Sequence, residues 1–180
     1  VTYGFGADPV VGAVQECADT TGSTSSSNPG GPYLGEYNAT VGALEWSGFP
    51  SSNIIEIVDQ ADAEARLGTY DVLLFMEFES CTPDATSWLT TVEGLMDLGG
   101  RVIITYPGWG SGTAFISDLG LFGTGTSASV SDPFVQLTHE FWDGGVPHSN
   151  YLNATNGWSW SGPGLVPLAH GAGAPDNLTV

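Results

Sequence analysis

The sequence predicts an α/β fold: an open, mostly parallel sheet flanked by helices, followed by a C-terminal part rich in loops and aromatic residues. The segments Val72–Met76 and Arg101–Tyr106 are almost continuously apolar, as strands are when both faces of a parallel sheet are covered. Helical periodicity fills the segment between them. An alternation of strand, helix and strand builds a parallel sheet with right-handed crossovers.

Size and composition fit a single α/β domain over residues 1–180. With 41% hydrophobic and 11% aromatic residues, the chain can bury a core of its own and does not belong to the disordered class. No apolar run approaches the roughly 20 residues that span a bilayer. We therefore expect no membrane insertion.

The N-terminal third predicts a strand, a long loop, a helix and a second strand. Val1–Ala7 and Val10–Val14 compete for the first strand, and we prefer Val1–Ala7. Ser, Thr, Gly and Pro dominate residues 19–31, which predicts a loop. Near-helical spacing of apolar residues predicts a helix over Leu34–Trp46, and the β-branched run Asn53–Val58 predicts a strand.

The middle of the chain predicts two helices around the strand Val72–Met76. Asp59–Leu67 is a short acidic helix closed by Gly68. Thr82 can cap the next helix, with Pro83 at its first position. One apolar stripe then runs along this helix until two glycines end it, and its members are Ala85, Trp88, Leu89, Val92, Leu95 and Met96.

After the strand Arg101–Tyr106 the pattern breaks into shorter pieces. Residues 108–112 are rich in glycine, and we interpret them as a tight turn, because a nucleotide-binding loop would carry a lysine. Ala114–Leu119 predicts a short helix and Phe134–Leu137 a helical turn. Leu165–Ala169 predicts one more strand, and loops rich in Gly, Asn and Trp fill the rest.

The charge balance narrows the class of partner. The chain has 20 acidic residues against two basic ones, Arg66 and Arg101, which gives a net charge of −18. Nucleic acid and anionic membranes are therefore excluded as expected partners. Two interpretations stay open: an acidic surface that only keeps the chain in solution, or one that collects cations.

Several carboxylates fall at predicted strand ends, which meet at one edge of a parallel sheet. They are Asp8, Asp59, Glu77 and Glu79, with Asp62 nearby. Clustered carboxylates repel each other unless a cation joins them, and calcium prefers oxygen ligands. The sequence leaves open a solvated acidic rim or a calcium site, so the expected cofactor is none, or calcium.

The two cysteines and the histidines support two different hypotheses. Cys17 and Cys81 are the only cysteines, and a disulfide between them is the favoured interpretation. The alternative makes Cys81 a nucleophile near a helix start, with His139 or His148 as the base. His170 is a further histidine without a clear partner in the sequence.

An aromatic cluster lies in the polar C-terminal loops. Trp142, Tyr151, Trp158 and Trp160 are its main members, beside Phe141. Tryptophan in polar loops can stack on sugars or anchor a protein interface. A small satellite core under long loops is the competing interpretation.

Several features favour an extracellular or cell-surface location. They are the missing lysine, the acidic balance, the richness in Ser, Thr and Gly, and the even cysteine count. Asn38, Asn153 and Asn177 begin sequons for N-glycosylation. The chain starts without methionine, which is compatible with a leader already removed.

Taken in order, these elements resemble the class I glutamine amidotransferase-like superfamily of flavodoxin-like folds. The motifs that carry the resemblance are Leu-Gly-Thr-Tyr-Asp-Val-Leu-Leu-Phe at 67–75 and Leu-Gly-Gly-Arg-Val-Ile-Ile-Thr at 98–105, within a match over roughly residues 34–125. The corner where active members carry a cysteine falls on Tyr106 or Pro107. The resemblance therefore implies a non-catalytic branch attached to surface proteins, and leaves open that the chain is a fragment of a longer secreted protein.

The sequence thus predicts a non-enzymatic extracellular or cell-surface domain for binding or assembly. Its expected partner is a protein or a glycan at the cell surface, or a second copy of the chain. Two alternatives stay open, a Cys/His hydrolase and a carbohydrate-binding module.

Overall fold

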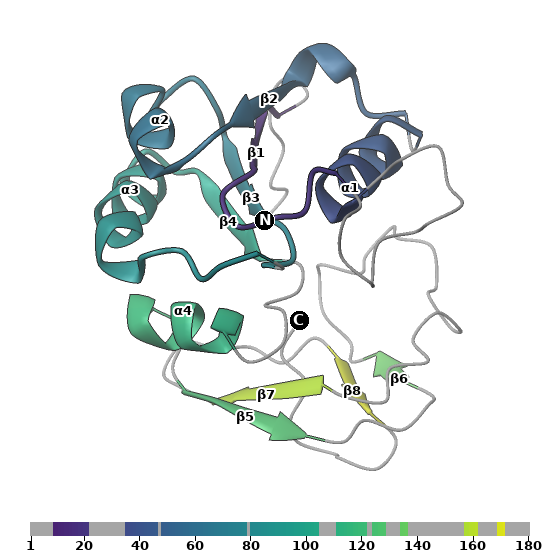
Figure 1. Cartoon of the computed structure of the whole chain (residues 1–180), viewed down its shortest axis with the longest axis vertical. Helices are drawn as coiled ribbons and strands as arrows, with labels where there is room; N and C mark the ends of the chain where they lie inside the picture. Colours follow the sequence, from purple (N-terminus) through teal and green to yellow (C-terminus); the bar gives the residue numbers. More distant parts are fainter. Residues whose placement is uncertain are drawn as a thin grey trace. The chain divides into compact units, whose positions relative to one another are not determined.

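The computed structural model describes residues 9–21, 35–46, 48–78, 80–104 and 111–121, together with four short strands after residue 121. For those strands and for residues 111–113 it gives the backbone path. The chain divides into two compact units, Val1–Leu119 and Gly120–Val180, each treated by itself below. Figure 1 shows the elements of both units.

Strands and helices alternate along the first unit. A short 3-10 helix, η1, precedes the second strand. The elements are β1 (Val11–Val14), α1 (Gly35–Trp46), η1 (Ser51–Asn53), β2 (Ile54–Ile57), α2 (Gln60–Ala65), β3 (Val72–Phe75), α3 (Ala85–Asp97), β4 (Arg101–Ile104) and α4 (Ser111–Leu119).

The four strands form one parallel sheet in the order β2-β1-β3-β4. Val11 pairs with Ile54 on one side and with Val72 on the other, and Val72 pairs with Arg101. This is the strand order with which flavodoxin-like doubly wound sheets begin. The predicted α/β class with a parallel sheet and flanking helices is confirmed.

The central strand of the sheet lies in the second of the two candidate segments, Val10–Val14. Val11–Val14 forms β1, so our preference for Val1–Ala7 is wrong for the described sheet, and residues 1–8 lie outside the described part. All four residues of β1 are buried, because β2 and β3 flank it. A Cβ added at Gly12 would lie 3.2 Å from the Tyr70 ring, so a glycine here lets the ring approach the sheet.

Helix α1 covers one face of the sheet, and α2 and α3 lie on the other (Figure 1). On the α1 face, Tyr37 packs with alternate strand residues, while Val41 and Leu44 complete the contact from α1. The strand residues of this cluster are Val11, Ala13, Val72 and Leu74. Alternation along each strand explains why neighbouring residues serve opposite faces.

An aromatic cluster fills the α3 face. The Phe75 ring centroid lies 4.8 Å from that of Trp88 and 5.3 Å from that of Phe115, and Phe78 contacts Phe115 at 5.2 Å. Trp88, Phe75 and Phe115 are each completely buried. The apolar stripe predicted for this helix faces the core at Ala85, Trp88, Val92 and Leu95. The prediction is wrong for Met96, which is 50% exposed near the end of the helix.

The start of α3 differs from the prediction. Asp84, not Thr82, is the N-cap, and its carboxylate accepts hydrogen bonds from Thr86 N at 3.1 Å and from Ser87 Oγ at 2.5 Å. These bonds hold the pKa of Asp84 below its usual value. Thr82 and Pro83 precede the helix because aspartate offers the stronger acceptor two residues later.

The described residues of the second unit include four short strands. β5 (Thr124–Ala128) pairs with β7 (Gly157–Ser161), and β6 (Phe134–Gln136) pairs with β8 (Ala169–Gly171), both antiparallel. The helical turn predicted at Phe134–Leu137 is wrong, since Phe134–Gln136 is a strand. Three residues in a row are too few to separate the two periodicities from sequence.

Tyr70 makes stability depend on alkaline pH. Its hydroxyl donates to Ala63 O at 3.0 Å within the core, and desolvation by burial, with a smaller contribution from Asp62, raises its pKa to about 12. The tyrosine of the unfolded chain has a pKa near 10. The stabilisation that comes from the raised pKa of Tyr70 is therefore fully present below pH 10 and is lost as the pH rises towards 12. We expect a loss of about 2 kcal/mol over this range.

Urea unfolding between pH 9 and 12 measures this loss, and Tyr70→Phe is the matched control. The variant lacks the ionising hydroxyl, so its stability should fall less over the same range. An identical pH profile for the two proteins would contradict the assignment to Tyr70.

Candidate functional site

The candidate site is the carboxyl edge of the sheet between β1 and β3. From β1 the chain crosses through α1 to β2, and from β3 it crosses through α3 to β4 in the opposite direction along the sheet. Open α/β sheets bind ligands in the crevice that such a reversal creates beyond the strand ends. We call this position the switch point.

A disulfide joins the two loops that form the switch point. Cys17 follows β1 and Cys81 follows β3, and they are bonded with a Cα–Cα distance of 4.8 Å. Ser80 N also donates to Cys17 O at 3.0 Å. The predicted disulfide is confirmed, and the two loops are held together by a covalent bond and a backbone hydrogen bond.

The backbone at Cys17 is in the left-handed region. Its φ is 65°, which is uncommon for a residue with a side chain and costs about 1 kcal/mol or more. A turn in which Ala18 N donates to Gln15 O at 2.9 Å encloses this residue. Cys17 is buried, whereas Cys81 is exposed, so only one end of the disulfide meets solvent.

Glu16 connects the same loop to two helices. Its Oε2 atom accepts from Trp88 Nε1 at 3.0 Å and from Gln60 N at 3.2 Å. Gln60 Nε2 in turn donates to Oγ1 of the buried Thr91 at 2.8 Å. This network fixes the loop after β1 against the starts of α2 and α3, which leaves the carboxylate engaged in structural bonds.

The chain beyond Cys17 is bound to α1. Buried Asp19 accepts from Thr21 N at 2.8 Å, and Asp19 O accepts from Tyr37 N at 3.1 Å. Burial raises the pKa of Tyr37 above its usual value. Asn38, the first sequon residue, donates its side-chain amide to Thr20 O at 2.7 Å.

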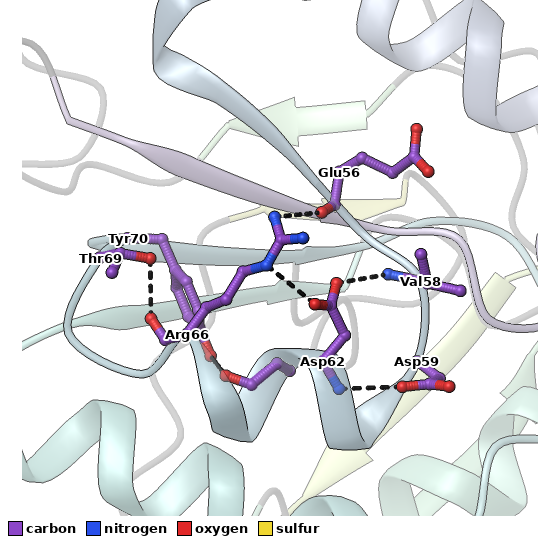
Figure 2. Close-up of polar contacts among 8 residues, drawn as sticks. Glu56, Val58, Asp59, Asp62, Arg66, Thr69 and Tyr70 are labelled. Atoms are coloured by element: carbon purple, nitrogen blue, oxygen red, sulfur yellow. Dashed lines mark hydrogen bonds and ion pairs between the residues drawn. The ribbon is translucent and has the colours of Figure 1, made fainter.

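The carboxylates predicted for calcium have other roles where the structure describes them. Asp59 is the N-cap of α2 and accepts from Asp62 N at 2.9 Å (Figure 2). Glu77 follows β3, while Asp8 and Glu79 lie outside the described residues. Among the described residues no group of three or more acidic, histidine or cysteine side chains could hold a metal. Calcium stays a prediction.

The predicted catalytic residues are not brought together in the described part. Cys81 has its sulfur in the disulfide, so it offers no thiolate in this state. His139 and His148 lie outside the described residues, and so do Tyr106 and Pro107 at the reactive corner. His170 lies on β8, opposite Val135.

The aromatic residues are only partly described. Trp158 and Trp160 lie on β7, opposite Ser127 and Gly125 of β5, so the loop expected there is in fact a strand. Trp142 and Tyr151 lie outside the described residues, as do the sequon residues Asn153 and Asn177.

Sequence reasoning missed the role of Glu16. Its one signal was position, since Glu16 lies two residues after the end of the buried strand β1 and next to Cys17. The tryptophan that binds it was assigned to the core stripe, where a ring N–H needs a partner when buried.

Two further findings bear on the class of protein. No helix in the described part of the chain has the length and apolar character needed to cross a membrane. Comparison of the chain with protein-family models, with curated proteins and with solved structures finds no match.

Proposed function

We propose that the chain is a non-enzymatic binding or assembly domain of an extracellular or cell-surface protein. One observation carries the proposal: the Cys17–Cys81 disulfide crosses the switch point. Enzymes of this architecture place their ligand and their reactive groups there. Here the two cysteines of the chain form a disulfide that joins the two loops, which favours a structural role for this edge of the sheet.

The chemistry of the chain fits that setting. Disulfides persist in oxidising compartments outside the cytosol. A net charge of −18 with only two basic residues keeps the chain away from anionic surfaces, so the proposed partner is a protein or a glycan rather than a nucleic acid. Calcium bound to the acidic surface and glycans on Asn38, Asn153 and Asn177 belong to the same proposal.

The resemblance to non-catalytic amidotransferase-like domains is part of the proposal too. It is supported by the strand order β2-β1-β3-β4 and by a sheet that is parallel throughout. Many unrelated functions share this kind of sheet, so the fold supports the family assignment without deciding it.

A carbohydrate-binding module is the second candidate, because of the register of β5 and β7. Trp158 and Trp160 lie two positions apart on one strand, and such positions fall on the same face of a sheet. Their partners in the register, Ser127 and Gly125, are small. Two neighbouring tryptophan positions flanked by small residues suit stacking against a sugar chain.

The test of the proposed function measures binding and turnover with the same preparation. The oxidised chain carries a fluorescent label and is titrated onto intact cells of its source, with and without calcium. We expect saturable binding and no hydrolysis of amide or ester substrates. Enzymatic removal of surface glycans separates a glycan partner from a protein partner, and the Trp158→Ala, Trp160→Ala variant should lose binding only in the glycan case.

The hydrolase alternative predicts the opposite result. It requires that the oxidised chain not bind, that reduction release turnover, and that alkylation of Cys81 abolish the turnover. That combination would overturn the proposal. Thiol titration gives the control, since the native and the denatured unreduced chain should both show no reactive thiol.

A further inference from the structure

The outer edge of β2 has backbone groups that face away from the sheet. In the described sheet β2 pairs with β1 and lies at one end of the strand order. Gln15 N donates to Ile57 O at 2.8 Å, so the Ile57 carbonyl faces β1. Because these groups alternate in direction along a strand, the Glu56 carbonyl and the Val58 N–H face outward.

One ion pair occupies both of these outward groups. Arg66 Nη1 donates to Glu56 O at 3.2 Å, and Asp62 Oδ2 accepts from Val58 N at 3.1 Å. Arg66 Nε closes the set by contacting Asp62 Oδ1 at 2.8 Å, as Figure 2 shows. An added strand, parallel or antiparallel, would donate to the first group and accept from the second. The ion pair therefore occupies the two groups to which an additional strand would bond.

The Asp62–Arg66 ion pair is important for its position on the β2 edge rather than for its contribution to stability. The Arg66 side chain is 45% exposed and that of Asp62 is 22% exposed, and ion pairs in such surroundings add little to stability. An open strand edge, by contrast, is a template for another strand. The edge sequence Ile-Ile-Glu-Ile is rich in β-branched residues, which favours such pairing.

Helix α2 holds the pair in place. Asp59 caps the helix by accepting from Asp62 N, and the four-residue spacing puts Asp62 and Arg66 on one side of it. Tyr70 fixes the same helix from the core through its bond to Ala63 O. Both side chains therefore reach the β2 edge from a helix that is itself anchored.

We propose that the Asp62–Arg66 pair is a plug that prevents β2 from adding a further strand. The strand that would add is β2 of a second copy of the chain. Each copy presents the same edge, so two-fold antiparallel pairing satisfies both at once. This inference is independent of the proposed binding function, because it rests on the first unit alone.

The test compares Arg66→Met with Arg101→Met. Both variants remove one of the two basic residues and change the net charge from −18 to −19, but only the first frees the Glu56 carbonyl on the β2 edge. Sedimentation velocity over a wide concentration range gives the self-association constant of each. We expect Arg66→Met to associate at least tenfold more tightly than Arg101→Met and the unmodified chain.

Hydrogen exchange locates the contact. In associated Arg66→Met, the amides of Glu56 and Val58 should gain protection, and those of β4 should not. Equal association of the two methionine variants would overturn the proposal, and so would protection gained only elsewhere. If Arg66→Met does not fold, Arg66→Lys replaces it, because lysine keeps the charge but lacks the fork that makes both contacts. A rise below threefold for that variant would likewise overturn the proposal.

Discussion

Removing the disulfide should cost the chain about 4 kcal/mol of unfolding free energy. The bond closes a loop between residues 64 apart in sequence, and the chain-entropy model gives this magnitude for a loop of that length. The variant is Cys17→Ala, Cys81→Ala, which introduces no new polar group at the buried position. Urea unfolding followed by circular dichroism measures the change, and the denaturant slope should rise because the unfolded chain becomes more expanded.

Reduction of the unmodified chain is the control for this variant. It breaks the same bond without changing the side chains, so both samples should lose similar stability. A loss below about 1 kcal/mol in both would show that the loops after β1 and β3 are already held together without the bond.

Trp88→Ala should destabilise the fold by about 4 kcal/mol. The side chain is completely buried, and its ring packs 4.8 Å from that of Phe75. Truncation leaves a cavity and removes the N–H that binds Glu16. Since domains of this size have only about 5–15 kcal/mol in total, the variant should be close to its folding limit. Urea unfolding by circular dichroism measures the loss.

Two variants separate the causes. Trp88→Phe keeps an aromatic ring but loses the donor to Glu16, and it should cost about 1–2 kcal/mol. Trp46→Ala makes the same truncation at a side chain that is 90% exposed, and it should change stability by less than about 0.5 kcal/mol. Similar losses at Trp46 and Trp88 would refute the packing argument.

The sheet could be predicted from two apolar runs, Val72–Phe75 and Arg101–Ile104, and from the glycines that end α3. Burial on both faces holds for the first run, whereas Ile103 in the second is 47% exposed. Gly100 is required after α3, because an added Cβ would collide with the Leu95 side chain. β1 is harder to predict, because Gly12 interrupts its apolar run. The glycine makes room for the ring of Tyr70, which is far away in sequence.

The site was predictable only where chemistry limits the options. Two cysteines in one chain have a single possible pairing, so the count predicts the partners of a disulfide, while a free Cys81 was the open alternative. Glu16 and Arg66 could not be assigned in the same way, because their partners, Trp88 and the β2 backbone, come into reach only after the sheet has formed. Asp59 and Asp62, which were considered for calcium, cap a helix and form an ion pair, and these are uses that their spacing also permits.

The bond between Cys17 and Cys81 also sets how the chain responds to mechanical force. When the two ends of the polypeptide are pulled apart, the bond limits how far the chain can lengthen, because the covalent path runs through the sulfur atoms instead of the residues between them. The disulfide thereby prevents about 220 Å of contour length, taken at roughly 3.5 Å for each residue, from extending. A protein anchored at a surface under flow would therefore reach its full length only after a reductant breaks the bond.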